Sequence, residues 1–175
     1  REPARLAVEK AFRLAHEHGK IVSLDPNYSP QIWPDHQEAA EVYRQMFRYA
    51  TITKPSLDDA KRFFGSEYQP EEYIAKYHEL GPPTVIFTMG REGVLISHDG
   101  KLLGHVPVRP IKVVDVTGAG DSFWAGFLVA LLDGNSLERC ALFAREVVEL
   151  KLTTVGPLPS LIDRSELYAR LPESL

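Results

Sequence analysis

The sequence predicts an α/β protein whose sheet is mostly parallel and includes one antiparallel hairpin. Short apolar or β-branched runs alternate with stretches of helical spacing, and strands that alternate with helices favour a parallel sheet. Two such runs, 93–97 and 101–106, flank a tight turn with the dipeptide Asp99-Gly100, which is typical of a hairpin. The 175 residues are enough for one domain with its own core.

Glycine and proline mark the ends of several predicted elements in the first half of the chain. Gly19 is a good stop for the first helix, Pro70 suits the first turn of a later helix, and Gly81 follows the end of that helix. The expected elements are, in order, a helix over 3–18, a strand within 20–26, a proline-rich loop over 26–35, a helix whose apolar face includes residues 39, 42, 43, 46 and 47, a strand and turn within 50–56, a short helix over 57–65 and a helix over 70–81.

Longer helices dominate the second half. Phe123, Trp124 and Phe127 continue one apolar face and are expected in the core, and Cys140 is expected to be buried in the next helix. Asp163 and Glu166 have the spacing of a capping box. The expected elements are, in order, a strand over 84–90, the hairpin, a strand over 111–116, helices over 120–132 and 137–152, and a short helix over 164–171.

The composition narrows the classes of function. A net charge of −4 without a cluster of lysine and arginine argues against nucleic acid as a partner. No apolar run approaches membrane-spanning length, so no membrane partner is expected. Cys140 is the only cysteine, which excludes a disulfide framework and favours a reducing, cytoplasmic setting. The histidines have no spacing that suggests a metal site.

Polar residues follow several of the predicted strands. In open α/β sheets, ligands bind outside the carboxyl ends of the strands. The residues expected there are Asp25, Lys54, Thr88 and the segment 115–121. The sequence therefore predicts that the chemistry lies at this edge of the sheet.

The segment 115–121 contains a glycine turn followed by a carboxylate. Gly118 and Gly120 allow a close approach of the backbone, and successive N–H groups before a helix can bind a phosphate. Asp121 then fits a catalytic base beside the transferred group. A second interpretation is that Asp121 only complements the helix dipole, worth about 0.3–1 kcal/mol. A dinucleotide fingerprint fits poorly, because Phe123 stands where the third glycine is needed.

Residues 115–127, DVTGAGDSFWAGF, resemble the second signature of the ribokinase-like, or PfkB, carbohydrate kinases. Three further segments precede it and occur in the same order as in that family: LDPN at 24–27, KPS..DA at 54–60 and TMGREG at 88–93. The resemblance is nearest to the branch of 2-keto-3-deoxygluconate kinases and fructokinases, where a tryptophan such as Trp33 follows the DPN motif. It implies a three-layer ribokinase-like fold and ATP-dependent phosphorylation of a sugar or sugar-acid hydroxyl.

The resemblance also implies roles for individual residues. Asp121 would accept the proton of the sugar hydroxyl, and the N–H groups of Gly118, Ala119 and Gly120 would form an anion hole around the transferred phosphoryl group. The remaining implied positions are Thr88, Gly90 and Gly93 along ATP, Lys54 in the nucleotide site, Gly156 closing the nucleotide pocket, Asp59 toward Mg²⁺, and Asp115 with Thr117 toward a monovalent cation such as K⁺.

The chain departs from the family pattern at three places. Ser56 and Asp59 occupy the place of a motif that organises Mg²⁺, but the same pair also suits a helix N-cap. Ser29 stands where relatives carry an arginine, and serine cannot reproduce a guanidinium fork. Arg145 replaces an asparagine; it could stack on adenine, although a solvated helix face is the simpler interpretation. These departures keep open an alternative, a non-catalytic nucleotide-binding or regulatory relative.

The resemblance implies that residues 1–175 form the C-terminal portion of a PfkB-type kinase domain, with the nucleotide site and the catalytic base. In the family, an N-terminal half with its own glycine signature and a β-rich lid builds most of the sugar pocket and the dimer contact. We expect that part to be absent from this chain, so the isolated chain is expected to be inactive and a homodimer is expected only for the full-length protein.

Overall fold

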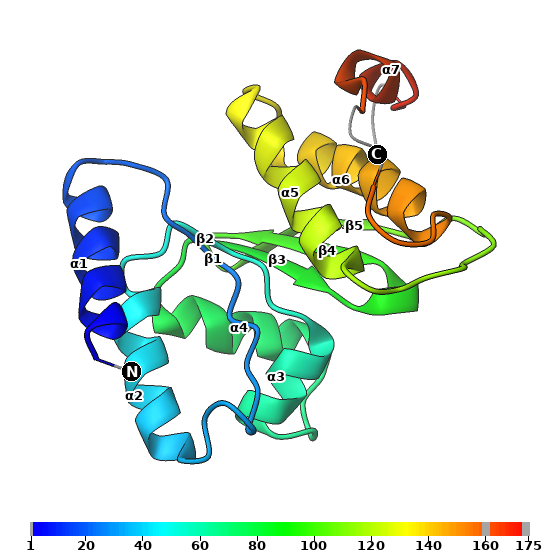
Figure 1. The fold of residues 1–175 in the computed structure, drawn as a ribbon. Helices are drawn as coiled ribbons and strands as arrows, with labels where there is room; N and C mark the ends of the chain where they lie inside the picture. Colours follow the sequence, from blue (N-terminus) through cyan, green and yellow to red (C-terminus); the bar gives the residue numbers. More distant parts are fainter. Residues whose placement is uncertain (1, 159–161, 173–175) are drawn as a thin grey trace. The chain divides into compact units, whose positions relative to one another are not determined.

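The computed structural model describes residues 2–158 and 162–172. The chain forms two compact units (Figure 1). The first unit runs to Gly90 and includes Val94–Leu103, and the second contains Arg91–Gly93 and the chain from Gly104 onward. Within the described residues, no helix has the length and hydropathy needed to cross a membrane.

A five-stranded sheet has the spatial order β1-β2-β3-β4-β5. Strands β1 and β2 pair in parallel, as do β2 and β3, whereas β3 and β4 are antiparallel. Asp99 and Gly100, between β4 and β5, both have positive φ angles of 49° and 73°, so the predicted tight hairpin turn is confirmed. The strands are β1 (Ser23–Leu24), β2 (Ile52–Thr53), β3 (Thr84–Thr88), β4 (Val94–His98) and β5 (Lys101–Val106).

The core of the first unit joins the sheet to its helices. Tyr73 and Tyr77 of α4 pack with Phe47 of α2 and with Val85 and Phe87 of β3, and all five side chains are buried. Each large apolar side chain removed from water contributes about 1.5–3 kcal/mol, so this cluster holds the parallel strands in place. The predicted helices are confirmed as α1 (Ala4–Glu17), α2 (His36–Phe47), α3 (Leu57–Phe64) and α4 (Pro70–Leu80).

Helix α1 forms as predicted, but its apolar face is not buried against the described residues. Val8 and Leu14 remain 47% and 39% exposed. The contacts of α1 include two polar ones: Arg5 lies 3.4 Å from Glu38, and a ring nitrogen of His16 lies 3.1 Å from the carbonyl oxygen of Tyr49. Helical spacing therefore predicted helix α1 correctly. Burial of its apolar side chains depends on another segment packing against them, and the spacing carries no information about that segment.

The second unit is built around two packed helices, α5 (Ala119–Leu132) and α6 (Leu137–Leu152). Phe123, Trp124 and Phe127 are buried as predicted, and the rings of Trp124 and Phe127 stack with centroids 5.3 Å apart. Cys140 is fully buried in α6, and burial raises the pKa of its thiol to about 12. The prediction of a buried cysteine in this helix is confirmed.

Two shorter elements complete the fold. A 3₁₀ turn, η1 (Gly90–Glu92), follows β3, and α7 (Arg164–Ala169) is the last helix. The Asp163 carboxylate accepts hydrogen bonds from the N–H groups of Ser165 and Glu166, so it caps α7. The Glu166 side chain lies 3.8 Å from Arg170.

The strand predicted over residues 111–116 is wrong. These residues are neither helix nor strand, and Val113, Val114 and Val116 are 47–69% exposed. The N–H of Val114 donates at 2.8 Å to the carbonyl oxygen of Leu152, at the end of α6. A β-branched run forms a strand only when a neighbouring strand completes its ladder. In this segment a helix end accepts the hydrogen bond instead.

We predict that Gly126→Val destabilises the packing of α5 on α6. A Cβ atom at Gly126 would lie 2.9 Å from Cγ2 of Val147 and 3.2 Å from Cα of Ala144. Overpacking of this kind lowers the free energy of unfolding by about 1–3 kcal/mol, which chemical denaturation measures. The matched control is Ala125→Val at the neighbouring exposed position, where only helix propensity changes, by about 0.5 kcal/mol. Equal losses in the two variants would contradict the close approach.

Candidate functional site

The structure confirms that three predicted site residues follow neighbouring strands of the first unit. Asp25 comes directly after β1, Lys54 directly after β2, and Thr88 ends β3. The Lys54 N–H donates to the carbonyl oxygen of Leu24 at 3.2 Å, and the Thr88 N–H donates to that of Pro55 at 3.0 Å. The carboxyl ends of these parallel strands therefore lie side by side, as the sequence predicted.

Lys54 forms an ion pair at this edge. Its ammonium nitrogen lies 2.8 Å from Oδ2 of Asp25, and only 5% of the residue is exposed. Burial, together with the nearby carboxylates of Asp59 and Asp25, raises the pKa of Tyr43 to about 12. The Tyr43 hydroxyl therefore stays protonated and donates to the carbonyl oxygen of Pro26 at 2.5 Å. At this edge, the Lys54 ammonium and the Tyr43 hydroxyl therefore both have acceptors within the protein.

Asp59 is a helix cap. Its Oδ2 accepts from the N–H of Ser56 at 3.2 Å and from the Ser56 hydroxyl at 2.6 Å, while the Asp59 N–H donates back to that hydroxyl at 3.0 Å. The other carboxylate oxygen lies 3.9 Å from Arg62. The capping-box interpretation is confirmed. Because both oxygens have partners within the helix terminus, Asp59 fits this cap better than it fits a magnesium ligand.

Gly90 and Gly93 have left-handed φ angles of 58° and 90°. A Cβ atom at Gly93 would lie 2.3 Å from the carbonyl oxygen of Val106, so the close approach of two backbones requires glycine there. The space around Gly90 is open. Among the described residues beyond its two chain neighbours, no heavy atom would lie within 4 Å of a Cβ atom added there. Gly93 is therefore needed for packing, and Gly90 leaves its backbone accessible.

The glycine–aspartate turn lies at the start of α5 in the second unit. Gly118 adopts the left-handed conformation, with φ 74° and ψ 12°, and directly precedes the helix. The Ala119 N–H donates to the carbonyl oxygen of Val116 at 3.2 Å, and the first helical bond runs from the Ser122 N–H to the Gly118 carbonyl oxygen at 2.9 Å. The N–H groups of Gly120 and Asp121 lie in the first helical turn, where no backbone acceptor within the helix exists.

Asp121 lies in that first turn and is exposed. Among the described residues, its side chain has no hydrogen bond or ion pair. An exposed carboxylate beside N–H groups at the positive end of a helix can accept a proton from a bound hydroxyl, while the N–H groups bind an anion. The turn therefore places a carboxylate next to N–H donors, the two kinds of group that phosphoryl transfer uses.

Asp115 organises the loop before this turn. One carboxylate oxygen accepts from the Thr117 N–H at 2.9 Å, and the other lies 3.1 Å from the ammonium of Lys151 and 3.4 Å from the backbone nitrogen of Gly156. The Thr117 N–H, followed by the Lys151 ammonium and the Thr117 hydroxyl, holds the pKa of Asp115 well below its usual range. Asp115 is therefore an anion that joins three segments of the second unit.

Lys151 is the site residue that sequence reasoning missed. Its side chain is 7% exposed, and its ammonium contacts Asp115 and the carbonyl oxygen of Thr154 at 3.4 Å. A detectable signal existed, because Lys151 continues the stripe of Cys140, Ala144 and Val147 along α6. A cation at the end of a buried apolar stripe needs an anionic partner.

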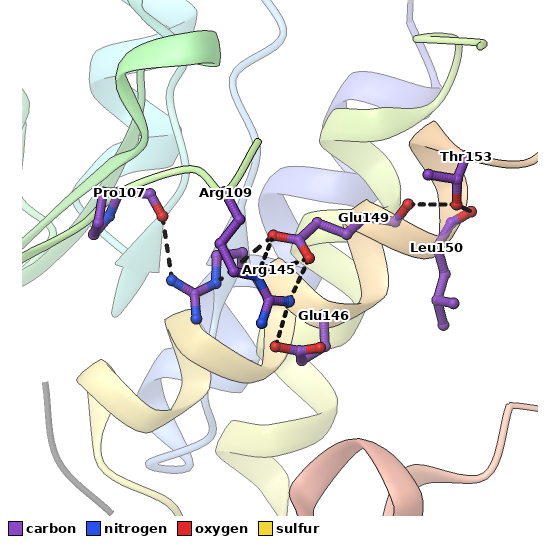
Figure 2. A network of polar contacts seen from close by, with 7 residues as sticks. All are labelled: Pro107, Arg109, Arg145, Glu146, Glu149, Leu150 and Thr153. Carbon is purple, nitrogen blue, oxygen red and sulfur yellow. Dashed lines mark hydrogen bonds and ion pairs between the residues drawn. The ribbon is translucent and has the colours of Figure 1, made fainter. Parts of the chain in front are cut away.

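Figure 2 shows a second charged network in this unit, in which Arg109 faces Glu146 and Glu149 of α6. These two carboxylates raise the pKa of Arg109 further above its usual range. Arg145 donates to the carbonyl oxygen of Pro107 at 3.2 Å, and its side chain is only 14% exposed. The expectation of a solvated Arg145 is wrong, because the chain at Pro107 and the Glu149 carboxylate, 3.9 Å away, hold it against the helix.

Solved structures of sugar and nucleoside kinases share this fold. Aminoimidazole riboside kinase from Salmonella enterica, complexed with aminoimidazole riboside and an ATP analogue, aligns with a TM-score of 0.84 and 27% identity over 96% of this chain and 58% of its own. A fructokinase double mutant from Vibrio cholerae, bound to fructose, ADP and a potassium ion, aligns with a TM-score of 0.82 and 26% identity over 97% and 56%. The fold is therefore the ribokinase-like α/β fold, as predicted.

Residues 4–164 match the pfkB family of carbohydrate kinases, and the chain belongs to this family. An ATP-dependent 6-phosphofructokinase of Thermoanaerobacterium thermosaccharolyticum is 34% identical over 93% of this chain and 50% of its own length. A 2-dehydro-3-deoxygluconokinase of Escherichia coli is 38% identical over 76% and 45%. The chain spans about half the length of these curated relatives.

We predict that Asp25→Asn destabilises the first unit through Lys54. The substitution leaves a buried ammonium without its carboxylate, which lowers the free energy of unfolding by about 3 kcal/mol in chemical denaturation. The double variant Asp25→Asn/Lys54→Met regains much of that loss, because no unpaired charge remains. Asp99→Asn, at an exposed turn position, is the control. Strictly additive losses in the double variant would contradict a coupled pair.

Proposed function

We propose that the full-length protein transfers the γ-phosphoryl group of ATP to a hydroxyl of a sugar or sugar acid. Asp121 is the general base that accepts the proton of this hydroxyl, and the backbone of Gly118–Gly120 is the anion hole. The observation that carries the proposal is the turn itself: a left-handed Gly118 precedes an N-terminal helical turn with an exposed carboxylate. Membership of the pfkB family supports the same reaction.

The donors of the anion hole are not all equally available. The Ala119 N–H donates within the turn to Val116 at 3.2 Å, a long bond that an incoming anion can share or displace. The Gly120 N–H lies in the first helical turn, where the helix supplies no acceptor. The charge that develops on a transferred phosphoryl group is most favourably bound by donors that need no rearrangement. The Gly120 N–H is therefore more available to an anion than the Ala119 N–H.

ATP supplies the phosphoryl group when it is bound. The residues that would hold it are the glycine turn for the phosphates and, from the family pattern, Lys54, Thr88, Gly90, Gly93 and Gly156 for the remainder. Magnesium is implied by the family, yet no group of three or more acidic, histidine or cysteine side chains that could hold a metal occurs in residues 2–158 and 162–172. No step of the proposed reaction is therefore assigned to a protein-bound magnesium ion.

The acceptor class follows from the relatives. Their names include a sugar acid, 2-dehydro-3-deoxygluconate, and free or phosphorylated fructose. All of these present a hydroxyl on a sugar-like chain, which is the group that a carboxylate base activates. We assign the acceptor to this class without choosing among its members.

A second function has a specific observation in its favour. Asp59 serves as a helix cap and Arg145 is held by Pro107 and Glu149, so neither side chain is free for the role of its family counterpart. A relative that binds nucleotide without turnover would tolerate both changes. Calorimetry with ATP, combined with an assay over a panel of keto-deoxy acids, fructose, ribose and nucleosides, separates the two functions, since binding without turnover would identify the second.

We predict that Asp121→Asn in the full-length protein lowers kcat by about 100- to 10,000-fold, the usual contribution of a general base. Nucleotide affinity, measured by calorimetry, stays largely unchanged, because the amide keeps the size of the side chain. Glu138→Gln is the matched control, since Glu138 lies in the first turn of α6 as Asp121 does in α5. Wild-type kcat in Asp121→Asn would rule out the base, and an equal loss in Glu138→Gln would assign the effect to helix stability.

We predict that purified residues 1–175 show no sugar-dependent consumption of ATP. The chain covers about half the length of its curated relatives, and the implied sugar pocket lies mainly in the other half. A coupled assay that follows ADP formation with and without each sugar measures this directly. Sugar-dependent turnover by the purified chain would show that these residues form a complete site.

A further inference from the structure

The Lys151 ammonium lies among oxygen atoms that are typical ligands of a monovalent cation. It contacts the Asp115 carboxylate at 3.1 Å and the Thr154 carbonyl oxygen at 3.4 Å. Lys151 lies in the last turn of α6, where the negative end of the helix dipole favours positive charge. A carboxylate, a main-chain carbonyl group and a helix C-terminus together form a site for a cation. In this chain, the cation at that site is the ammonium group of Lys151.

The family pattern assigns the same loop to a free ion. Asp115 and Thr117 match positions that help to hold a monovalent cation in relatives, and the Vibrio cholerae fructokinase was solved with a potassium ion. In this chain, both Asp115 oxygens already have donors: the Thr117 N–H holds one, and Lys151 with Gly156 holds the other. A second positive charge beside the ammonium would be repelled. The residues present therefore do not fit an additional potassium ion at Asp115.

An ammonium group can replace such an ion because it carries the same charge and binds the same carboxylate and carbonyl oxygens. The covalent link between the ammonium and the chain lowers the entropic cost of placing a cation at this site. A free ion must be captured from solution, whereas the Lys151 nitrogen is delivered by a helix that is already folded. The side chain is 93% buried, so its charge acts on Asp115 with little screening by salt.

Lys151 also lies near Gly118, the first residue of the proposed anion hole. Its Cε atom would lie 4.0 Å from a Cβ atom at Gly118, so the lysine stem passes beside the left-handed glycine. Asp115, fixed by the ammonium, in turn accepts from the Thr117 N–H one residue before that glycine. The ammonium thus holds Asp115 in place, the lysine stem lies beside Gly118, and the positive charge is close to the turn that would bind the phosphoryl group.

We propose that Lys151 is a built-in replacement for the monovalent cation of this family and positions the glycine turn. This inference rests on the proposed kinase function. Lys151 acts through Asp115 and Gly118 and touches no reacting atom. The full-length protein therefore needs no added potassium, and removal of the ammonium converts it into a potassium-dependent protein.

The test compares full-length wild type, Lys151→Ala and Lys151→Met in choline, sodium, potassium and ammonium chloride at equal ionic strength. Wild type has the same kcat/KM in all four salts. Lys151→Ala loses about 100-fold in choline, the scale expected for a misplaced site, and potassium or ammonium restores most of it in a saturable manner. Lys151→Met loses activity similarly but is not restored, because its side chain still fills the space that an ion would need.

Lys112→Ala is the control, since Lys112 is exposed and lies outside the Asp115 contacts; it should behave as wild type in every salt. Activation of the wild type by potassium over choline would overturn the proposal. Full activity of Lys151→Ala in choline, or a loss that no cation restores, would overturn it as well.

A second measurement keeps the inference separate from the proposed function. Potassium should raise the Tm of Lys151→Ala by several degrees relative to choline and leave the Tm of wild type and Lys151→Met unchanged. Absence of kinase activity in the full-length wild type would refute the proposed function, while the Tm comparison would still decide whether Lys151 occupies a cation site. No selective effect of potassium on the Tm of Lys151→Ala would count against that occupancy.

Discussion

The ion pair between Asp115 and Lys151 determines how the second unit presents its glycine turn. Asp115 contacts the N–H of Thr117, the ammonium at the end of α6 and the backbone nitrogen of Gly156, and so connects its own loop to the end of α6 and the turn that follows it. The loop before α5 gains no order from a β-ladder, because residues 111–116 form no strand. Its conformation therefore depends on this carboxylate and on the hydrogen bond from Val114 to the end of α6.

The two helix ends that meet in this region have opposite electrostatic character. The N-terminus of α5 carries N–H groups that favour an anion, whereas the C-terminus of α6 carries carbonyl groups that favour the Lys151 cation. Phe123, Trp124 and Phe127 are buried beneath the first turns of α5 and fix its direction. Asp121 is therefore an exposed carboxylate on a helix whose apolar side chains are buried.

Ion pairs in which at least one partner is buried recur in this chain. Lys54 with Asp25 in the first unit, and Arg109 with Glu146 and Glu149 in the second, each match a desolvated charge with an opposite one. Asp59 and Arg145, which depart from the family pattern, are held by other local contacts. Asp59 closes a capping box and Arg145 holds the chain at Pro107. At these positions the local fold uses polar groups that could otherwise have met a ligand.

Local patterns in the sequence determined most of the helices, the hairpin turn at Asp99-Gly100 and the sheet edge with Asp25, Lys54 and Thr88, because spacing, capping and turn conformation act over a few residues. The motif around Asp121 likewise identified the turn. The tertiary structure alone decided that residues 111–116 form no strand, that the apolar face of α1 lies exposed, and that Lys151 neutralises Asp115. These outcomes depend on which surface or charge meets a segment from elsewhere in the chain, and periodicity carries no information about that partner.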